Sequence, residues 1–168
     1  MSMEIYNPSA RFIPAQGDKS AKVAFVSSAP RAREQSMGRG YQGSDTKTLL
    51  DIAHRSGVHS KDMYLTYVVK ERPPRDDITF FIDLSKKDVH YNQKYKMYLD
   101  TLQKELSEWE GNVIVAVGLV ALYALTGERG ITNWRGSVLE STLIPGKKVI
   151  PIIDPYMSFK MYMYTYLI

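Results

Sequence analysis

The chain contains no cysteine. Disulfide bonds, thiolate metal sites, cysteine nucleophiles and cysteine-ligated iron–sulfur clusters are therefore excluded for it. No apolar run approaches the roughly 20 residues that cross a membrane. The first eight residues lack the basic and apolar segments of a secretory signal. We expect a cytoplasmic protein without a membrane partner, associated with the nucleoid, or present in the host cytoplasm if a phage encodes it.

Two phosphate-binding glycine patterns are also missing, G-x-G-x-x-G and G-x-x-x-x-G-K-[ST]. A nucleotide-binding α/β protein therefore stays open only as a minor alternative. The three histidines, His54, His59 and His90, lack the spacing of metal ligands. We expect neither a metal nor a cofactor.

The 168 residues fit one domain, and the net charge of +4 permits a nucleic-acid partner without requiring one. Apolar strand-like runs alternate with helical patterns, which predicts an α/β fold with a parallel sheet. We expect an arm over residues 1–21 and one domain over residues 22–168. The predicted strands are Lys22–Ser28, Asp62–Lys70, Asn112–Val117 and Lys147–Ile153, the last either paired with Val138–Leu143 or preceded by a turn. The predicted helices are Asp45–Ser56, Tyr91–Trp109, Leu119–Thr126 and Met157–Ile168. Residues 75–89 are predicted to form a long surface loop with a short helical piece.

The loop that follows the first predicted strand is the first candidate for a site. It is rich in glycine and contains Arg31, Arg33 and Arg39. In open α/β sheets, ligands bind beyond the carboxyl ends of the strands. Glycine lets a backbone approach a ligand closely, and guanidinium groups suit anions such as phosphate.

Four segments occur in the order typical of one family. They read S-S-A-P…G-R-G-Y-Q-G, Y-L-T-Y-V-V-K-E-R-P-P, V-I-V-A-V-G-L-V-A-L-Y-A-L-T-G…I-T-N-W-R-G and V-I-P-I-I-D-P. Over residues 22–160 the chain resembles the uracil-DNA glycosylase superfamily, most closely family 4, and also the glycosylase-like domains that begin some phage DNA polymerases. The resemblance implies a three-layer α/β/α sandwich around a four-stranded parallel sheet, and DNA as the partner.

The chain departs from the family at several functional positions. Ser28 replaces the acidic residue after the first strand, and Tyr41 replaces the phenylalanine that stacks on the flipped uracil. Tyr67 replaces the asparagine that reads the uracil edge. Glu71 replaces a cluster-binding cysteine, so no iron–sulfur cluster is implied. Asp154 replaces the histidine that stabilises the departing base, and a carboxylate there repels that anion by about 4 kcal/mol at ~4 Å and an effective dielectric of 20. We therefore expect ordinary uracil excision to be weak or absent.

The resemblance assigns a provisional role to each matching position. The predicted catalytic residues are Ser28 and Asp154. The predicted base-binding residues are Ala29, Pro30, Tyr41 and Tyr67. The predicted DNA-contacting residues are Arg31, Arg39, Lys70, Arg72, Asn133 and Arg135. Structural interpretations stay open beside these roles, because Asp154-Pro155 also suits a helix N-cap.

Three functions remain compatible with these residues. The first is a DNA glycosylase retuned to another base, ordinary or modified, that is flipped into a pocket. The second is an inactive glycosylase fold that binds DNA, for example as a polymerase-associated module. The third is the nucleotide-binding protein mentioned above. The Tyr- and Met-rich segment Met157–Ile168 predicts a contact surface for a polymerase or another replication protein.

Overall fold

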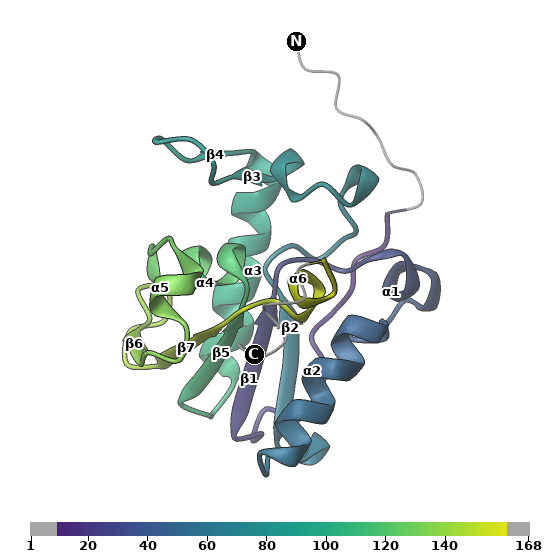
Figure 1. Cartoon of the computed structure of the whole chain (residues 1–168), viewed down its shortest axis with the longest axis vertical. Helices are drawn as coiled ribbons and strands as arrows, with labels where there is room; N and C mark the ends of the chain where they lie inside the picture. Colours follow the sequence, from purple (N-terminus) through teal and green to yellow (C-terminus); the bar gives the residue numbers. More distant parts are fainter. Residues whose placement is uncertain (1–9, 161–168) are drawn as a thin grey trace.

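The computed structural model describes residues 10–160. A central sheet has the strand order β2-β1-β5-β7-β6 (Figure 1). Four of these strands are parallel, and β6 pairs antiparallel with β7. The predicted α/β sandwich is confirmed, with one correction: the sheet has a fifth, two-residue edge strand. The strand bounds are β1 Val23–Ser27, β2 Met63–Tyr67, β5 Val113–Val117, β6 Leu139–Glu140 and β7 Lys148–Ile152.

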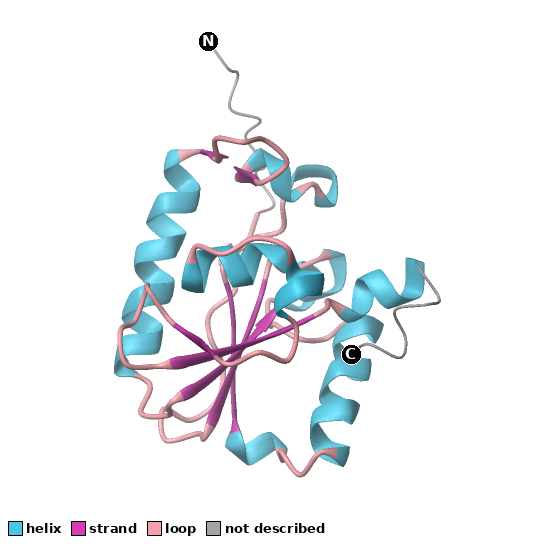
Figure 2. Cartoon of the chain, turned by 60° about the vertical axis from the view of Figure 1, so that its left-hand side comes forward, coloured by secondary structure: helices cyan, strands magenta, loops and turns pink. Residues whose placement is uncertain are grey.

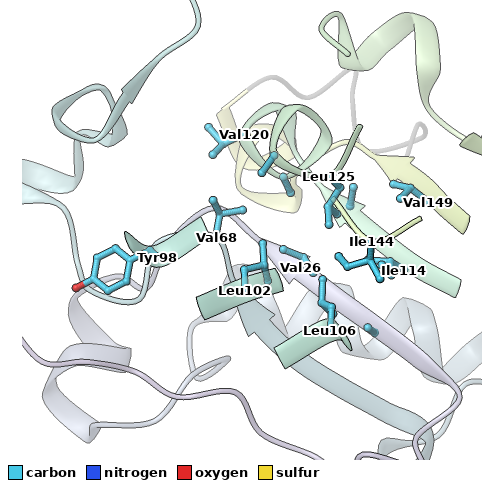
Figure 3. Close-up of a cluster of buried hydrophobic side chains, with 14 of the residues drawn as sticks. Val26, Val68, Tyr98, Leu102, Leu106, Ile114, Val120, Leu125, Ile144 and Val149 are labelled. Carbon is cyan, nitrogen blue, oxygen red and sulfur yellow. The ribbon is translucent and has the colours of Figure 1, made fainter. Parts of the chain in front are cut away.

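Helices cover both faces of the sheet (Figures 1 and 2). On one face, Phe25 of β1 joins a buried cluster with Leu49 and Ala53 of α2. On the other face, Val26 of β1 packs in a cluster with residues of α3 and α4 that includes Leu102 (Figure 3). The strands are buried on both sides, which is why they read as continuous apolar runs. The helix bounds are α2 Ser44–Arg55, α3 Gln93–Glu108, α4 Leu119–Thr126 and α6 Pro155–Lys160.

The segments expected as loops contain short elements of their own. The arginine- and glycine-rich loop includes the helix α1, and residues 75–89 include 3-10 turns and one strand of a small hairpin. The 3-10 turns agree with the short helical piece expected within residues 75–89, whereas the other elements are too short for periodicity to reveal them. Their bounds are α1 Ala32–Met37, η1 Ser60–Asp62, η2 Pro74–Asp76, η3 Ile78–Phe80, β3 Ile82–Asp83, β4 His90–Tyr91 and α5 Ile131–Trp134. No helix within residues 10–160 has the length and apolar character needed to cross a bilayer.

At both edges of the sheet, some of the backbone hydrogen-bonding groups are paired with other segments or absent. Along β2, the backbone of Gln16 forms an isolated antiparallel bridge with Leu65, and the Ile13 N–H donates to the Lys70 carbonyl at 2.6 Å. At the other edge, β6 pairs with only two residues of β7. Further along β7 stands Pro151, which has no N–H, and its carbonyl accepts from the Gly136 N–H at 2.8 Å.

Trp109 ties three segments together at the amino-terminal end of the sheet. Its indole Nε1 donates to the Ala21 carbonyl at 2.6 Å, and its side chain is 1 % exposed. The Lys147 ammonium donates to the carbonyls of Trp109 and Gly111, at 2.8 and 2.6 Å. The end of α3 is thereby joined to the chain entering β1 and to the chain entering β7.

We predict that Trp109→Phe lowers the free energy of unfolding by about 1–3 kcal/mol, because the buried Ala21 carbonyl loses its donor. Urea denaturation followed by circular dichroism measures the change. The control is Tyr91→Phe, at an aromatic ring that is 57 % exposed, which should alter stability by no more than about 0.5 kcal/mol. Equal stability of the two variants would contradict the anchoring role of the indole.

Candidate nucleobase pocket

A pocket of about 250 Å³ lies at the carboxyl ends of the parallel strands. It is lined by Ser28 after β1, Tyr67 at the end of β2, Val117 at the end of β5 and Asp154 after β7. The strand order changes direction between β1 and β5, since β2 lies on one side of β1 and β7 lies beyond β5. Ligands of open α/β sheets bind at such a switch point. The fold therefore builds the pocket where a ligand site is expected.

Ser28 and Asp154 both lie close to Gly118, which follows β5. A Cβ atom at Gly118 would lie 3.3 Å from the Asp154 Cβ and 3.9 Å from the Ser28 Oγ. Gly118 also has a φ of 89°, a backbone conformation that favours glycine. Any side chain there would be strained and would crowd both polar groups. The two residues predicted to be catalytic are thus brought together.

Asp154 is both an N-terminal cap and a pocket residue. Its Oδ1 accepts the Tyr156 N–H at 3.0 Å, in the first turn of α6. Burial raises the pKa of its carboxyl above the usual range, although the Tyr156 N–H and the Arg31 charge act in the opposite direction. A carboxylate with a raised pKa is a better proton acceptor near neutral pH. The two roles predicted for Asp154 from the sequence, helix N-cap and site residue, are therefore compatible.

Tyr41 and Tyr67 stack on each other, with ring centroids 4.8 Å apart. Tyr67 lines the pocket, and its hydroxyl accepts the Tyr41 N–H at 2.7 Å. Tyr41 is buried behind it and does not line the pocket; its hydroxyl lies 2.7 Å from the Thr66 carbonyl and 2.9 Å from the Ser27 Oγ. The expected stacking role of Tyr41 is therefore corrected, because Tyr67 covers its ring.

The segment Ala29–Arg31 also lines the pocket. This position is compatible with the base-binding roles predicted for Ala29 and Pro30. Arg31 behaves differently from the expected phosphate contact. Its guanidinium carbon lies 3.5 Å above the centre of the Tyr156 ring, and its Nε lies 3.9 Å from Asp45 Oδ2. The charge of Arg31 is thus held inside the pocket by an aromatic face and a carboxylate.

Lys70 is fully buried, which corrects the prediction that it contacts DNA phosphates. Its ammonium donates to Thr66 Oγ1 at 2.6 Å and to Glu105 Oε2 at 2.9 Å. Burial lowers its pKa, and the neighbouring carboxylate opposes that shift. Arg72 forms a two-pronged ion pair with Asp76, at 2.8 and 2.9 Å, and Asp76 lines the pocket. Both cations are thus paired with carboxylates of the same chain, and a DNA contact by Arg72 stays a prediction.

The remaining predicted DNA contacts, Arg39, Asn133 and Arg135, are exposed and lie outside the pocket lining. Arg39 donates to Gln16 Oε1 at 3.2 Å. The loop that carries Asn133 and Arg135 is held against β7 by the Gly136–Pro151 hydrogen bond already described. A DNA contact by these three side chains stays a prediction.

Sequence reasoning missed Glu34, which organises the loop that borders the pocket. Its carboxylate accepts three backbone N–H groups, those of Arg31 at 3.1 Å, Gln42 at 3.1 Å and Gly43 at 3.0 Å. The side chain is 3 % exposed and contributes to the pocket lining. One feature of the sequence could have predicted this role. Arg31 is the N-cap residue of α1 and Glu34 is at position N3, where a carboxylate commonly accepts a hydrogen bond from the N-cap backbone.

The pocket is acidic although the chain is basic. Among the described residues that line it, four side chains are acidic and one, Arg31, is basic. The acidic residues are Glu34, Asp45, Asp76 and Asp154. Asp45 and Asp76 were also missed, because only the fold brings the start of α2 and the segment after Pro73 to the same cavity.

The iron–sulfur cluster of family 4 has no fitting ligand set here. The chain has no cysteine, and the resemblance described above implies that Glu71 replaces one cluster ligand. The buried Glu71 carboxylate instead accepts the Tyr98 hydroxyl at 3.0 Å and forms an ion pair with Lys94. Within residues 10–160, His, Asp and Glu side chains form no group of three that could hold a metal ion. The predicted contact surface Met157–Ile168 lies largely outside the described residues.

Comparison with known proteins identifies the class of fold. The model of the uracil-DNA glycosylase superfamily matches residues 14–163, so the chain belongs to that superfamily. It is similar to the type-4 uracil-DNA glycosylases of Thermotoga maritima, 28 % identical over 85 % of this chain, and of Archaeoglobus fulgidus, 27 % identical over 70 %. The matches cover 69 % and 54 % of those proteins. A similar protein from Pyrobaculum aerophilum is 27 % identical, and the match covers 52 % of its length.

We predict that Glu34→Gln lowers the free energy of unfolding by about 1–3 kcal/mol, because the amide nitrogen must face at least one of three backbone donors. Urea denaturation measures the loss, and limited proteolysis within residues 31–43 should become faster. The control is Glu110→Gln at an exposed position. If both variants match the unmodified protein, Glu34 does not hold the loop.

We predict that Asp154→Asn raises the free energy of unfolding at neutral pH by about 0.5–2 kcal/mol. Asparagine preserves the cap, but the folded chain no longer has to bury a carboxylate. Because the folded pKa is raised, the contribution of Asp154 to stability is present at low pH and is lost as the pH rises through that pKa. The advantage of the variant should therefore shrink on acidification. Thermal unfolding between pH 4 and pH 8 tests this, and a variant less stable at neutral pH would contradict it.

Proposed function

We propose that the chain binds DNA, accepts one extruded base in the pocket at the carboxyl ends of β1, β2, β5 and β7, and hydrolyses the bond between that base and its sugar. The observation that carries the proposal is the pocket itself, which combines Tyr67 with Ser28 and a half-buried carboxylate, Asp154. Its volume of about 250 Å³ is slightly below the roughly 300–1,000 Å³ of pockets for drug-sized ligands, which suits a single base.

Asp154 performs the central step in this proposal. Its carboxylate accepts a proton from the water that attacks the sugar carbon, and its negative charge stabilises the cationic sugar of the transition state. The raised pKa of Asp154 brings its basicity closer to the operating pH. Ser28, which also lies close to Gly118, orients the same water. Tyr67 forms the aromatic wall against which the base packs.

The acidic lining argues against the nucleotide-binding alternative. A phosphate group would enter a cavity with four carboxylates and a single guanidinium, which is already engaged by Asp45 and Tyr156. Extruded bases carry no phosphate into a pocket, because the sugar–phosphate backbone stays outside. In our proposal the exposed Arg39, Asn133 and Arg135 contact that backbone.

The test is base release from DNA duplexes that each contain one candidate: uracil, hypoxanthine, a 5-hydroxymethylpyrimidine or a glucosylated base. Mass spectrometry identifies the released base, and alkaline cleavage quantifies abasic sites. We expect release of at least one base, and we expect Asp154→Asn to slow it by about 10²–10⁴-fold. Because Asp154 acts in its ionised form, the rate should fall as the pH drops through its raised pKa.

The control variant is Asp88→Asn, which removes an exposed carboxylate away from the pocket and should leave the rate unchanged. A rate unaffected by Asp154→Asn would contradict the assigned role. If no base of any kind is released while salt-sensitive DNA binding persists, the chain is a binding module, as the second sequence-based hypothesis holds.

A further inference from the structure

The charges around the pocket are opposite in sign to those that would stabilise a neutral base as it departs from its sugar. A neutral pyrimidine departs as an anion, and a site for it must supply positive charge or hydrogen-bond donors. Here Glu34, Asp45, Asp76 and Asp154 surround the cavity. Even after the Arg72 ion pair offsets Asp76 and Arg31 offsets one further carboxylate, the balance stays negative. Such a lining opposes the formation of an anion within it.

The pocket already holds one planar cation. The guanidinium carbon of Arg31 lies 3.5 Å above the centre of the Tyr156 ring, and its Nε is 3.9 Å from Asp45 Oδ2. An aromatic ring together with a carboxylate binds flat cations by cation–π attraction and ion pairing. This pair is a built cation site, filled by a side chain of the same chain, and Arg31 comes from the loop before α1, so it leaves the site when that side chain rotates.

We propose that the base excised at this site is cationic, of the class of N-alkylated purines such as N7-methylguanine; this rests on the function proposed above. The cationic ring replaces Arg31 between Tyr156 and Asp45. Its positive charge is attracted by the whole lining, whereas a neutral base gains nothing from it.

The chemical step balances without an acid that protonates the leaving group. The bond between the sugar C1′ and the purine N9 breaks, and its electron pair moves to N9, which neutralises the cationic ring. The positive charge passes to the sugar, next to the Asp154 carboxylate. Water attacks C1′, and its proton goes to that carboxylate and then to solvent. The products are a neutral alkylated base and an abasic site. A stabilising histidine at the position of Asp154 is unnecessary for this leaving group.

The experiment compares kcat/KM on otherwise identical duplexes with one N7-methylguanine, one hypoxanthine or one uracil, and subtracts spontaneous loss measured without protein. One unit charge at ~4 Å changes a rate by about 10³-fold at an effective dielectric of 20. Allowing for water in the open pocket, we expect at least about 100-fold preference for the methylated base. Equal or faster release of uracil or hypoxanthine overturns the inference but leaves the proposed glycosylase standing. Release of no base from these three duplexes overturns the inference, and release of none from the wider panel described above overturns the proposed glycosylase as well.

The variant Asp45→Asn tests the cation site directly, because it removes the negative charge of Asp45 and preserves the shape of the side chain. We expect kcat/KM on N7-methylguanine to fall about 10-fold or more, with no fall for the neutral bases. Asp51→Asn, an exposed position on the same helix α2, is the matched control and should change neither. A parallel binding measurement uses 2′-fluoro duplexes, whose sugars resist hydrolysis. Tighter binding of the methylated duplex than of its guanine counterpart supports the inference, and equal binding contradicts it.

Discussion

Parallel pairing of β1 with β2 and β5, and of β5 with β7, is the constraint on which the candidate site depends. Because the strands run in one direction, their carboxyl ends reach the same edge of the sheet. The register sets Ser27 beside Tyr67, and Val117 beside Ile152. Side chains alternate between the two faces, so a slip of one residue would exchange the two buried clusters and move Tyr67 out of the pocket. The backbone hydrogen bonds between the strands therefore fix the positions of the pocket residues.

Two carboxylates line the same cavity, but their surroundings suit one to a structural role and the other to proton transfer. Glu34 accepts three backbone N–H groups, so its position is fixed. Asp154 accepts one, and burial raises its pKa. The first group is suited to holding a loop, and the second to exchanging a proton. The fold keeps a costly charge at Asp154, which is expected of residues retained for function.

Apolar, β-branched runs predicted the four parallel strands to within about three residues at each end. The family motifs predicted only part of the pocket lining, namely Ser28, Ala29, Pro30, Tyr67 and Asp154. Other features depend on contacts between distant segments. Lys70 looks like a surface cation in sequence, but Glu105, 35 positions later, neutralises it inside the core. Tyr41 looks like a loop aromatic, but the stacked Tyr67 ring covers it. No local pattern contains such information.

Pro151 and the bridge of Gln16 to Leu65 also determine how the protein behaves among its own copies. An open sheet edge offers unpaired backbone groups to which a neighbouring molecule can add a strand. Residues 13–16 occupy part of that row along β2, and Pro151 removes a donor from the last long strand, beyond the two residues already paired with β6. Strand addition is thereby hindered at both edges. Concentrated solutions should resist fibril-like assembly for this reason, independently of the net charge.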